Sequence, residues 1–109
     1  MKWPKEVILL LTRDKAIELL QGKQEYLRRE FGVSKIGIFG SVARDQSDKS
    51  SDVDIVVKFD RPIGFRFIEL ADYLEDLLGC KADILTLAGI EAIRSQNVAK
   101  SIKEDVIYV

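Results

Sequence analysis

The sequence predicts an α+β fold of two layers, in which helices pack against a small mixed β-sheet. Along the 109 residues, the hydrophobic patterns indicate helix, strand, strand, helix, strand, helix and strand, in that order. The connection between the first two strands is too short for a right-handed crossover, so the sheet should hold antiparallel as well as parallel pairs. No repeat, linker or low-complexity tract divides the chain, and we expect one domain over residues 1–109.

The first third of the chain predicts a long helix. Thr12 is a suitable N-cap with Asp14 in the first turn, and Gly32 is a suitable C-cap. Residues 2–11 fit either an earlier helical turn or an apolar lead-in. Between the two caps, apolar residues recur near helical spacing at Ala16, Ile17, Leu20, Leu27 and Phe31.

The next segment predicts two strands that flank a polar loop. Residues 35–39 alternate as a strand does, and residues 45–51 are polar enough to form a loop. A second strand is expected over residues 52–59, broken by Asp-Arg-Pro at 60–62. One face of this second strand should carry Val53, Ile55, Val57 and Phe59.

The last third predicts a helix, a strand, further helix and a final strand. Residues 67–78 carry an amphipathic apolar pattern that ends at Gly79, a candidate C-cap. Residues 81–85 predict a short third strand. Residues 89–104 look helical, in one piece or two, and residues 106–109 predict a last strand at an edge of the sheet.

Composition excludes several classes of protein. The chain is 47% apolar and 32% charged, as in ordinary soluble globules, and its net charge of −1 argues against strong non-specific nucleic-acid binding. The longest apolar run, residues 7–11, is too short to cross a membrane. The absence of His excludes His-based nucleophile activation and His zinc sites. One cysteine, Cys80, allows no internal disulfide, and we expect a cytoplasmic protein.

Asp52 and Asp54 are the first candidate functional residues. Residues two apart in a strand point the same way, so their carboxylates should lie a few ångströms apart. At ~4 Å and an effective dielectric constant of ~20, two such charges repel by roughly 4 kcal/mol. Protonation, full solvation or a bound cation would relieve this repulsion. Mg²⁺ is the natural cation, because it takes carboxylate and phosphate oxygens as ligands.

Gly40 and Ser41 offer the complementary half of a nucleotide site. A glycine at the end of a strand lets the backbone approach a ligand closely. A serine that opens a short helix supplies a hydroxyl and nearby free N–H groups, which commonly hold phosphate. A nucleoside triphosphate bridged by Mg²⁺ would fit between this turn and the two aspartates.

Asp83 is the third candidate carboxylate. It lies within a short apolar strand, where a buried charge would otherwise be costly. If this strand pairs beside residues 52–59, all three carboxylates converge. Two cations could then stabilise the attacking and leaving oxygens of an in-line displacement.

Each of these features also has an ordinary structural explanation. Gly40-Ser41 can be a common turn, Asp52 and Asp54 the solvated start of a strand, and Asp83 a cap or an ion-pair partner. Their combination at this spacing, with each part on the expected element, favours the nucleotide site.

Three further charged residues lie near these motifs. Arg44 fits equally a bidentate clamp on phosphate and an ion-pair partner of Asp48. Asp45 and Asp48 are rival metal ligands, but their polar loop makes simple solvation the better interpretation.

Other aspartate-rich or phosphate-binding signatures fit less well. An EF-hand that started at Asp52 would need Gly and Glu where the chain has Val57 and Ile63. The P-loop pattern is absent. Phosphatases with an aspartate nucleophile place Asp-x-Asp after an apolar strand, whereas here residues 49–51 are polar and the apolar residues follow.

At these residues the chain resembles the minimal nucleotidyltransferase (MNT) domains of the DNA polymerase β superfamily. Their hallmark is Gly-Ser, ten residues, Asp-x-Asp, and a later Asp on a neighbouring strand. Gly40-Ser41, Asp52-Val53-Asp54 and Asp83 match it, and the likeness extends over about residues 12–109. One departure concerns the turn: the chain has Asp45 where the family usually has glycine.

The resemblance implies a nucleotidyltransferase fold and the transfer of AMP from ATP to an acceptor hydroxyl, with release of pyrophosphate. Asp52, Asp54 and Asp83 would bind Mg²⁺, with two ions expected and Mn²⁺ as an alternative. Asp83 would also help to activate the acceptor. Gly40 and Ser41 would hold the triphosphate, with Arg44 as a further phosphate contact.

The resemblance also implies a partner. Many such small proteins are antitoxins that pair with a helical HEPN ribonuclease toxin and silence it by AMPylating a tyrosine. A domain of 109 residues that builds this site has little chain left for an acceptor pocket, so we expect a hetero-oligomer with a HEPN-type protein. The alternatives are a non-catalytic binding antitoxin of the same fold and a nucleotidyltransferase that modifies small molecules such as antibiotics.

Overall fold

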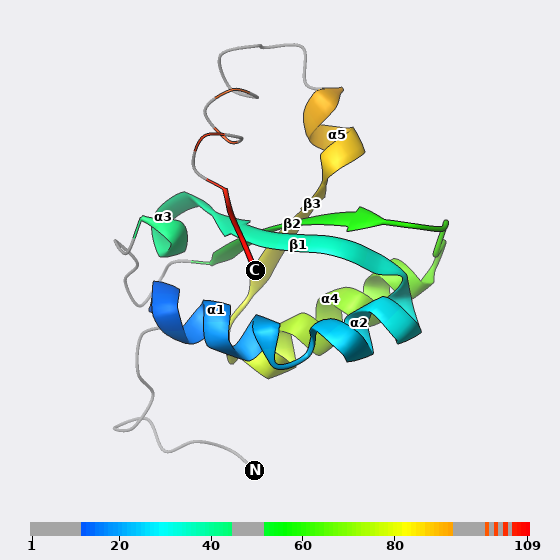
Figure 1. The fold of residues 1–109 in the computed structure, drawn as a ribbon, viewed down its shortest axis with the longest axis horizontal. Coiled ribbons are helices and arrows are strands. Elements are labelled where there is room, and N and C mark those ends of the chain that lie inside the picture. Colours follow the sequence, from blue (N-terminus) through cyan, green and yellow to red (C-terminus); the bar gives the residue numbers. More distant parts are fainter. Residues whose placement is uncertain (1–11, 45–51, 93–99, 101, 103, 105) are drawn as a thin grey trace.

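A four-stranded mixed sheet forms the centre of the molecule (Figure 1). The computed structural model describes residues 12–44, 52–92, 100, 102, 104 and 106–109. The strand order is β3-β2-β1-β4; β1 is antiparallel to both β2 and β4, and β2 is parallel to β3. The predicted mixed sheet is therefore confirmed. The strands are β1 (Val33–Phe39), β2 (Val53–Phe59), β3 (Ala82–Thr86) and β4 (Ile107–Tyr108).

The main helices form one layer on one side of this sheet. Figure 1 shows α1, α2 and α4 together beneath the strands, whereas α5 stands on the opposite side. A short helix, α3, follows β1 directly. The bounds are α1 (Arg13–Gln21), α2 (Gln24–Phe31), α3 (Gly40–Ala43), α4 (Arg66–Leu78) and α5 (Leu87–Glu91).

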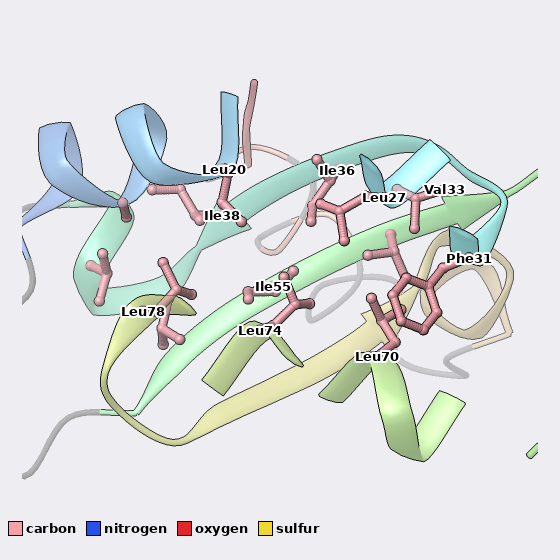
Figure 2. Close-up of a cluster of buried hydrophobic side chains, with 14 of the residues drawn as sticks. Leu20, Leu27, Phe31, Val33, Ile36, Ile38, Ile55, Leu70, Leu74 and Leu78 are labelled. Atoms are coloured by element: carbon pink, nitrogen blue, oxygen red, sulfur yellow. The ribbon is translucent and has the colours of Figure 1, made fainter. Parts of the chain in front are cut away.

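The larger core lies between the helical layer and the sheet (Figure 2). It takes Leu20 from α1, Leu27 from α2 and Leu74 from α4, all fully buried. From β2 it takes three residues of the predicted inner face. That part of the prediction is confirmed, because Val53, Ile55 and Val57 are buried there and Phe59 packs against them.

A smaller core covers the opposite face of the sheet. It contains Phe39 of β1, Val56 of β2 and Ile90 of α5. Val56 is fully buried, so β2 is covered on both faces, and its second face also carries a buried apolar residue that the sequence analysis did not assign. The reason is tertiary: α5 packs on the side that the alternation pattern assigns to solvent.

Helix ends follow the predicted caps, but the first helix is divided. The Thr12 side chain accepts a hydrogen bond from the Lys15 backbone N–H at 3.1 Å, and Gly32 ends α2 with a positive φ of 68°. The single helix expected between them is wrong, because α1 stops before Gly22 and α2 starts after Lys23. Glycine costs about 1 kcal/mol relative to alanine inside a helix, and Lys23 leaves the helical region of φ and ψ.

Other boundaries agree within two residues. β1 starts two residues earlier than predicted, β3 lies one residue later, and α4 ends before Gly79 as expected. The predicted last strand is confirmed at an edge, shortened to β4. The polar loop over 45–51, residues 2–11 and most of the helix predicted over 89–104 lie outside the described residues.

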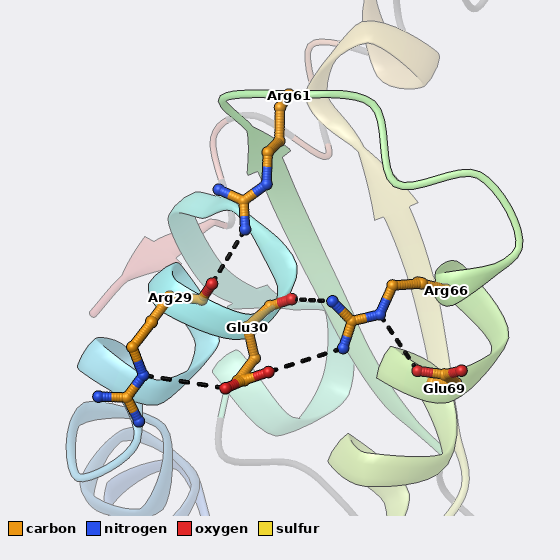
Figure 3. Close-up of polar contacts among 5 residues, drawn as sticks. All are labelled: Arg29, Glu30, Arg61, Arg66 and Glu69. Carbon is orange, nitrogen blue, oxygen red and sulfur yellow. Dashed lines mark hydrogen bonds and ion pairs between the residues drawn. The ribbon is translucent and has the colours of Figure 1, made fainter.

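Two arginines join the end of α2 to the connection between β2 and α4 (Figure 3). Arg61 Nη2 donates to the Arg29 carbonyl at 3.0 Å, and Arg66 Nη1 donates to the Glu30 carbonyl. These carbonyls belong to the last turn of α2, where no further helical N–H can reach them. Arg66 also lies over the Phe31 ring, 4.8 Å from its centroid, and contacts Glu69 at 3.2 Å.

Replacing Arg66 by alanine is expected to lower the free energy of unfolding by roughly 1–2 kcal/mol, since it removes a carbonyl cap and a cation–π contact. Urea denaturation measures the change. Lys15→Ala, which breaks only the exposed ion pair with Glu18, is the matched control and should cost less than about 0.5 kcal/mol. Equal stabilities for the two variants would contradict this role of Arg66.

Candidate functional site

The sheet register places two of the three predicted aspartates, Asp54 and Asp83, side by side. Asp54 of β2 and Asp83 of β3 are direct partners in the parallel pair, and neighbouring strands lie about 4.8 Å apart. Asp52 immediately precedes β2 and lies two residues before Asp54. Side chains of lateral partners share a face, so Asp54 and Asp83 lie on the face of Phe39 and Val56, opposite the larger core.

The charges of these aspartates act on one another. Asp54 is half-buried, whereas Asp52 and Asp83 are exposed. Burial raises the pKa of the Asp54 carboxyl, and the charges of Asp83 and Asp52 raise it further. The nearby Arg44 charge acts in the opposite direction and lowers this pKa. Ionisation of the Asp54 carboxyl is thus disfavoured by its acidic surroundings.

Gly40 closes the site on the side of β1. Phe39, the last residue of β1, is the register partner of Asp54, so the following turn lies against that carboxylate. Gly40 has a φ of +72°, and a Cβ atom added there would lie 2.1 Å from Oδ2 of Asp54. A residue with a side chain would be strained at this φ and would have to displace the Asp54 carboxylate. The close approach predicted for this glycine is present, and its neighbour in the structure is a carboxylate.

Ser41 and Arg44 also lie at this end of the sheet. Ser41 is half-buried in α3, which begins at Gly40 as predicted, and Arg44 is exposed directly after α3. The charge of Arg44 reaches Asp54, whereas its other predicted partner, Asp48, lies outside the described residues, as does Asp45. The phosphate contacts of Gly40, Ser41 and Arg44 stay predictions.

Glu75 is a supporting residue that the sequence analysis missed. Its Oε2 accepts a hydrogen bond from the Ala82 backbone N–H at 2.9 Å, so the last turns of α4 hold the start of β3. Asp83 is the next residue. Nothing in the sequence marks this contact, because Glu75 is seven residues away and looks like any polar residue of an amphipathic helix.

The donor set fits a hard divalent cation by its chemistry. Carboxylate oxygens are the ligands that Mg²⁺ prefers, and a cation between Asp54 and Asp83 would relieve their mutual repulsion. Among the residues that the structure describes, no three His, Cys, Asp or Glu side chains form a group ready to hold a metal. Asp54 and Asp83 are neighbours in the sheet, but the expected convergence of all three carboxylates on one point is not found in this structure. Side-chain rotation would have to bring them onto an ion.

Comparison with known proteins decides the family. A family model for nucleotidyltransferase domains matches residues 20–109. The chain belongs to the nucleotidyltransferase family. It is 38% identical over 101 residues to the protein adenylyltransferase MntA of Thermococcus cleftensis, covering 92% of this chain and 98% of that protein. One of several similar proteins of Methanocaldococcus jannaschii, provisionally named protein adenylyltransferases, is 44% identical over 93 residues, covering 84% of this chain and 92% of that protein.

Solved structures agree on the fold of this nucleotidyltransferase. A structure provisionally described as a minimal nucleotidyltransferase superposes with a TM-score of 0.62 at 26% identity, covering 84% of this chain and 93% of that chain. A crystal structure of a toxin–antitoxin with AMP-PNP superposes with a TM-score of 0.59 at 21% identity, covering 90% and 72%. The expected nucleotidyltransferase fold is confirmed. In the described part of the chain, no helix has the length and apolarity that a membrane span needs.

Asp54→Asn is expected to stabilise the protein at neutral pH in metal-free buffer, by up to roughly 1 kcal/mol after allowance for solvent screening. The folded-state pKa of Asp54 is raised above its unfolded value. Its stabilising contribution is therefore complete below the unfolded pKa of about 3.9 and is lost as the pH rises through the folded pKa. Asparagine does not titrate, so the stability of the variant relative to wild type should increase as the pH rises over this range.

Urea denaturation between pH 3 and pH 8 in the presence of a chelator measures this difference. Asp72→Asn, on the exposed side of α4, controls for the loss of one negative charge. A variant that is less stable than wild type at pH 7, or a difference that does not change with pH, would contradict the electrostatic account.

Proposed function

We propose that this nucleotidyltransferase is a Mg²⁺-dependent protein adenylyltransferase that transfers AMP from ATP to a tyrosine of a HEPN-type toxin. It would thereby act as the antitoxin of that toxin in the cytoplasm. The observation that carries the proposal is the register pairing of Asp54 with Asp83 beside Gly40, in a chain whose relatives are named protein adenylyltransferases.

In this proposal the turn after β1 binds the triphosphate of ATP, and the aspartates near the start of β2 and in β3 bind the metal. The backbone of Gly40 and the hydroxyl of Ser41 hold the triphosphate, with Arg44 as a further positive group toward phosphate. Asp52, Asp54 and Asp83 hold the metal. Bound Mg²⁺, or Mn²⁺ in its place, supplies positive charge that neutralises the phosphates and polarises the reacting phosphoryl group.

The transfer itself is an in-line displacement at the α-phosphorus of ATP. The acceptor hydroxyl oxygen forms a new bond to this phosphorus, and the bond to the oxygen that bridges to the β-phosphate breaks. Pyrophosphate leaves with the electron pair of that bond. The proton of the hydroxyl passes to the Asp83 carboxylate, which lies on the strand farthest from Gly40, and then to water.

Similar solved structures support the proposal of a toxin partner. Two of them are crystal structures of the toxin–antitoxin MntA-HpeT, one of which carries a tyrosine-to-alanine substitution. They superpose on this chain with TM-scores of 0.59 and 0.56 at 20% and 23% identity. Those proteins assemble as toxin and antitoxin, and we infer the same arrangement here. The helical HEPN nature of the partner rests on the family resemblance.

The test uses the protein encoded by the gene next to that of this chain, as the candidate toxin. Mass spectrometry of that protein after incubation with this chain, ATP and Mg²⁺ tests the proposal. The expected result is a mass increase by AMP on a tyrosine. The double variant Asp52→Asn plus Asp54→Asn should lower the transfer rate by a factor of about 100 or more, because it removes metal-binding charge. Asp72→Asn, an exposed charge on α4, is the matched control and should transfer at the wild-type rate.

Three outcomes would contradict parts of this proposal. Transfer by the double variant at the control rate would overturn the assigned site. Tight binding to the toxin without any added AMP would instead indicate a non-catalytic antitoxin. Transfer to small hydroxyl compounds but not to the protein would indicate a small-molecule nucleotidyltransferase.

A further inference from the structure

An exposed apolar side chain continues the acidic face of the sheet along the edge strand β3. Leu85 lies two residues after Asp83 in β3, so the two side chains share a face. Leu85 is 37% exposed, whereas its register partner Val56 on β2 is fully buried. Of the described large apolar residues, only Phe65, Ile68 and Tyr108 are exposed as well, and none of the three lies on β3.

The strand order determines from which side an acceptor reaches the reacting phosphorus. Gly40 follows β1, Asp54 lies on the next strand, and Asp83 lies on β3. An in-line displacement requires the acceptor oxygen and the leaving pyrophosphate on opposite sides of the phosphorus. With the triphosphate at the end of β1, the acceptor has to approach over β3. Beyond β3 the described residues contain no further strand, so β3 is the outermost strand on that side.

Leu85 is placed where the body of such an acceptor would lie. Residues two apart in a strand are separated by about 6.7 Å, which is close to the reach of a tyrosine side chain. A phenol with its hydroxyl at Asp83 would therefore lay its ring over Leu85. A serine or threonine hydroxyl at the same point would leave Leu85 uncovered, because its side chain ends within one or two atoms of the backbone.

We propose that Leu85 is a specificity-determining residue, an apolar platform that favours an aromatic hydroxyl over an aliphatic hydroxyl as the acceptor of AMP. This inference rests on the proposed transfer to a protein hydroxyl and adds the means by which the acceptor is selected. Burial of the ring against leucine is favourable in proportion to the apolar area removed from water. A serine or threonine side chain, which offers the hydroxyl without a ring, buries no comparable apolar area against Leu85.

Two short peptides that differ only in one central residue, tyrosine or serine, test the proposal with the full chain, ATP and Mg²⁺. The wild type should show a higher kcat/KM for the tyrosine peptide. Leu85→Ala should lower that kcat/KM about tenfold through KM. It should leave the serine peptide and the KM for ATP within about twofold of wild type.

Two variants control for indirect effects. Leu85→Met keeps an apolar side chain of similar volume and should retain the tyrosine preference within about twofold. Ile68→Ala removes an exposed apolar side chain from α4, which packs on the opposite side of the sheet, and should change neither peptide's kinetics. Thermal denaturation of each variant shows that the folded protein is being compared.

The results separate this inference from the proposed function. AMP transfer to protein tyrosine with equal losses for both peptides in Leu85→Ala, or with no loss at all, would overturn the platform and leave the transferase intact. Equal kcat/KM values of the wild-type protein for the serine and tyrosine peptides would also overturn the platform and leave the transferase intact. Absence of transfer to the partner and to both peptides would overturn both.

Discussion

The parallel pairing of β2 with β3 is the constraint on which the site depends. Five consecutive buried or half-buried residues of β2, including Val53 and Ile55, lock this strand between two apolar layers. A slip of one residue would turn Asp54 toward the larger core and an apolar residue toward solvent, which burial forbids. The register that results sets Asp54 opposite Asp83. Packing on one face of the sheet thereby fixes chemistry on the other.

This arrangement gathers like charges that folding alone does not favour. Burial and two neighbouring carboxylates disfavour ionisation of Asp54, and its carboxylate fits against the turn after β1 because Gly40 has no side chain. The stability that holds these groups together comes from elsewhere: the apolar core, the capped helices and the arginine contacts at the C-terminal end of α2. Functional sites commonly hold such local conflicts, since the groups are arranged for a ligand.

Sequence reasoning recovered what depends on local chemistry. Thr12 and Gly32 mark helix ends through their capping geometry, and the Gly-Ser and Asp-x-Asp spacing pointed to residues that the sheet brings together. It did not recover what depends on distant parts of the chain. The break after Gly22, the burial of Val56 under α5 and the contact of Glu75 with β3 all come from tertiary packing. The one-residue offset of β3 has the same origin, because a strand end is set by its partner.

Paramagnetic broadening of backbone amide signals by Mn²⁺ tests the central claim most directly, because it locates a bound cation without any assumption about the acceptor. At substoichiometric Mn²⁺, we predict selective loss of the signals of residues 39–41, 52–54 and 82–84, reversed by excess Mg²⁺. Broadening centred on other acidic surfaces, such as the exposed side of α4, with these three segments unaffected, would contradict the account.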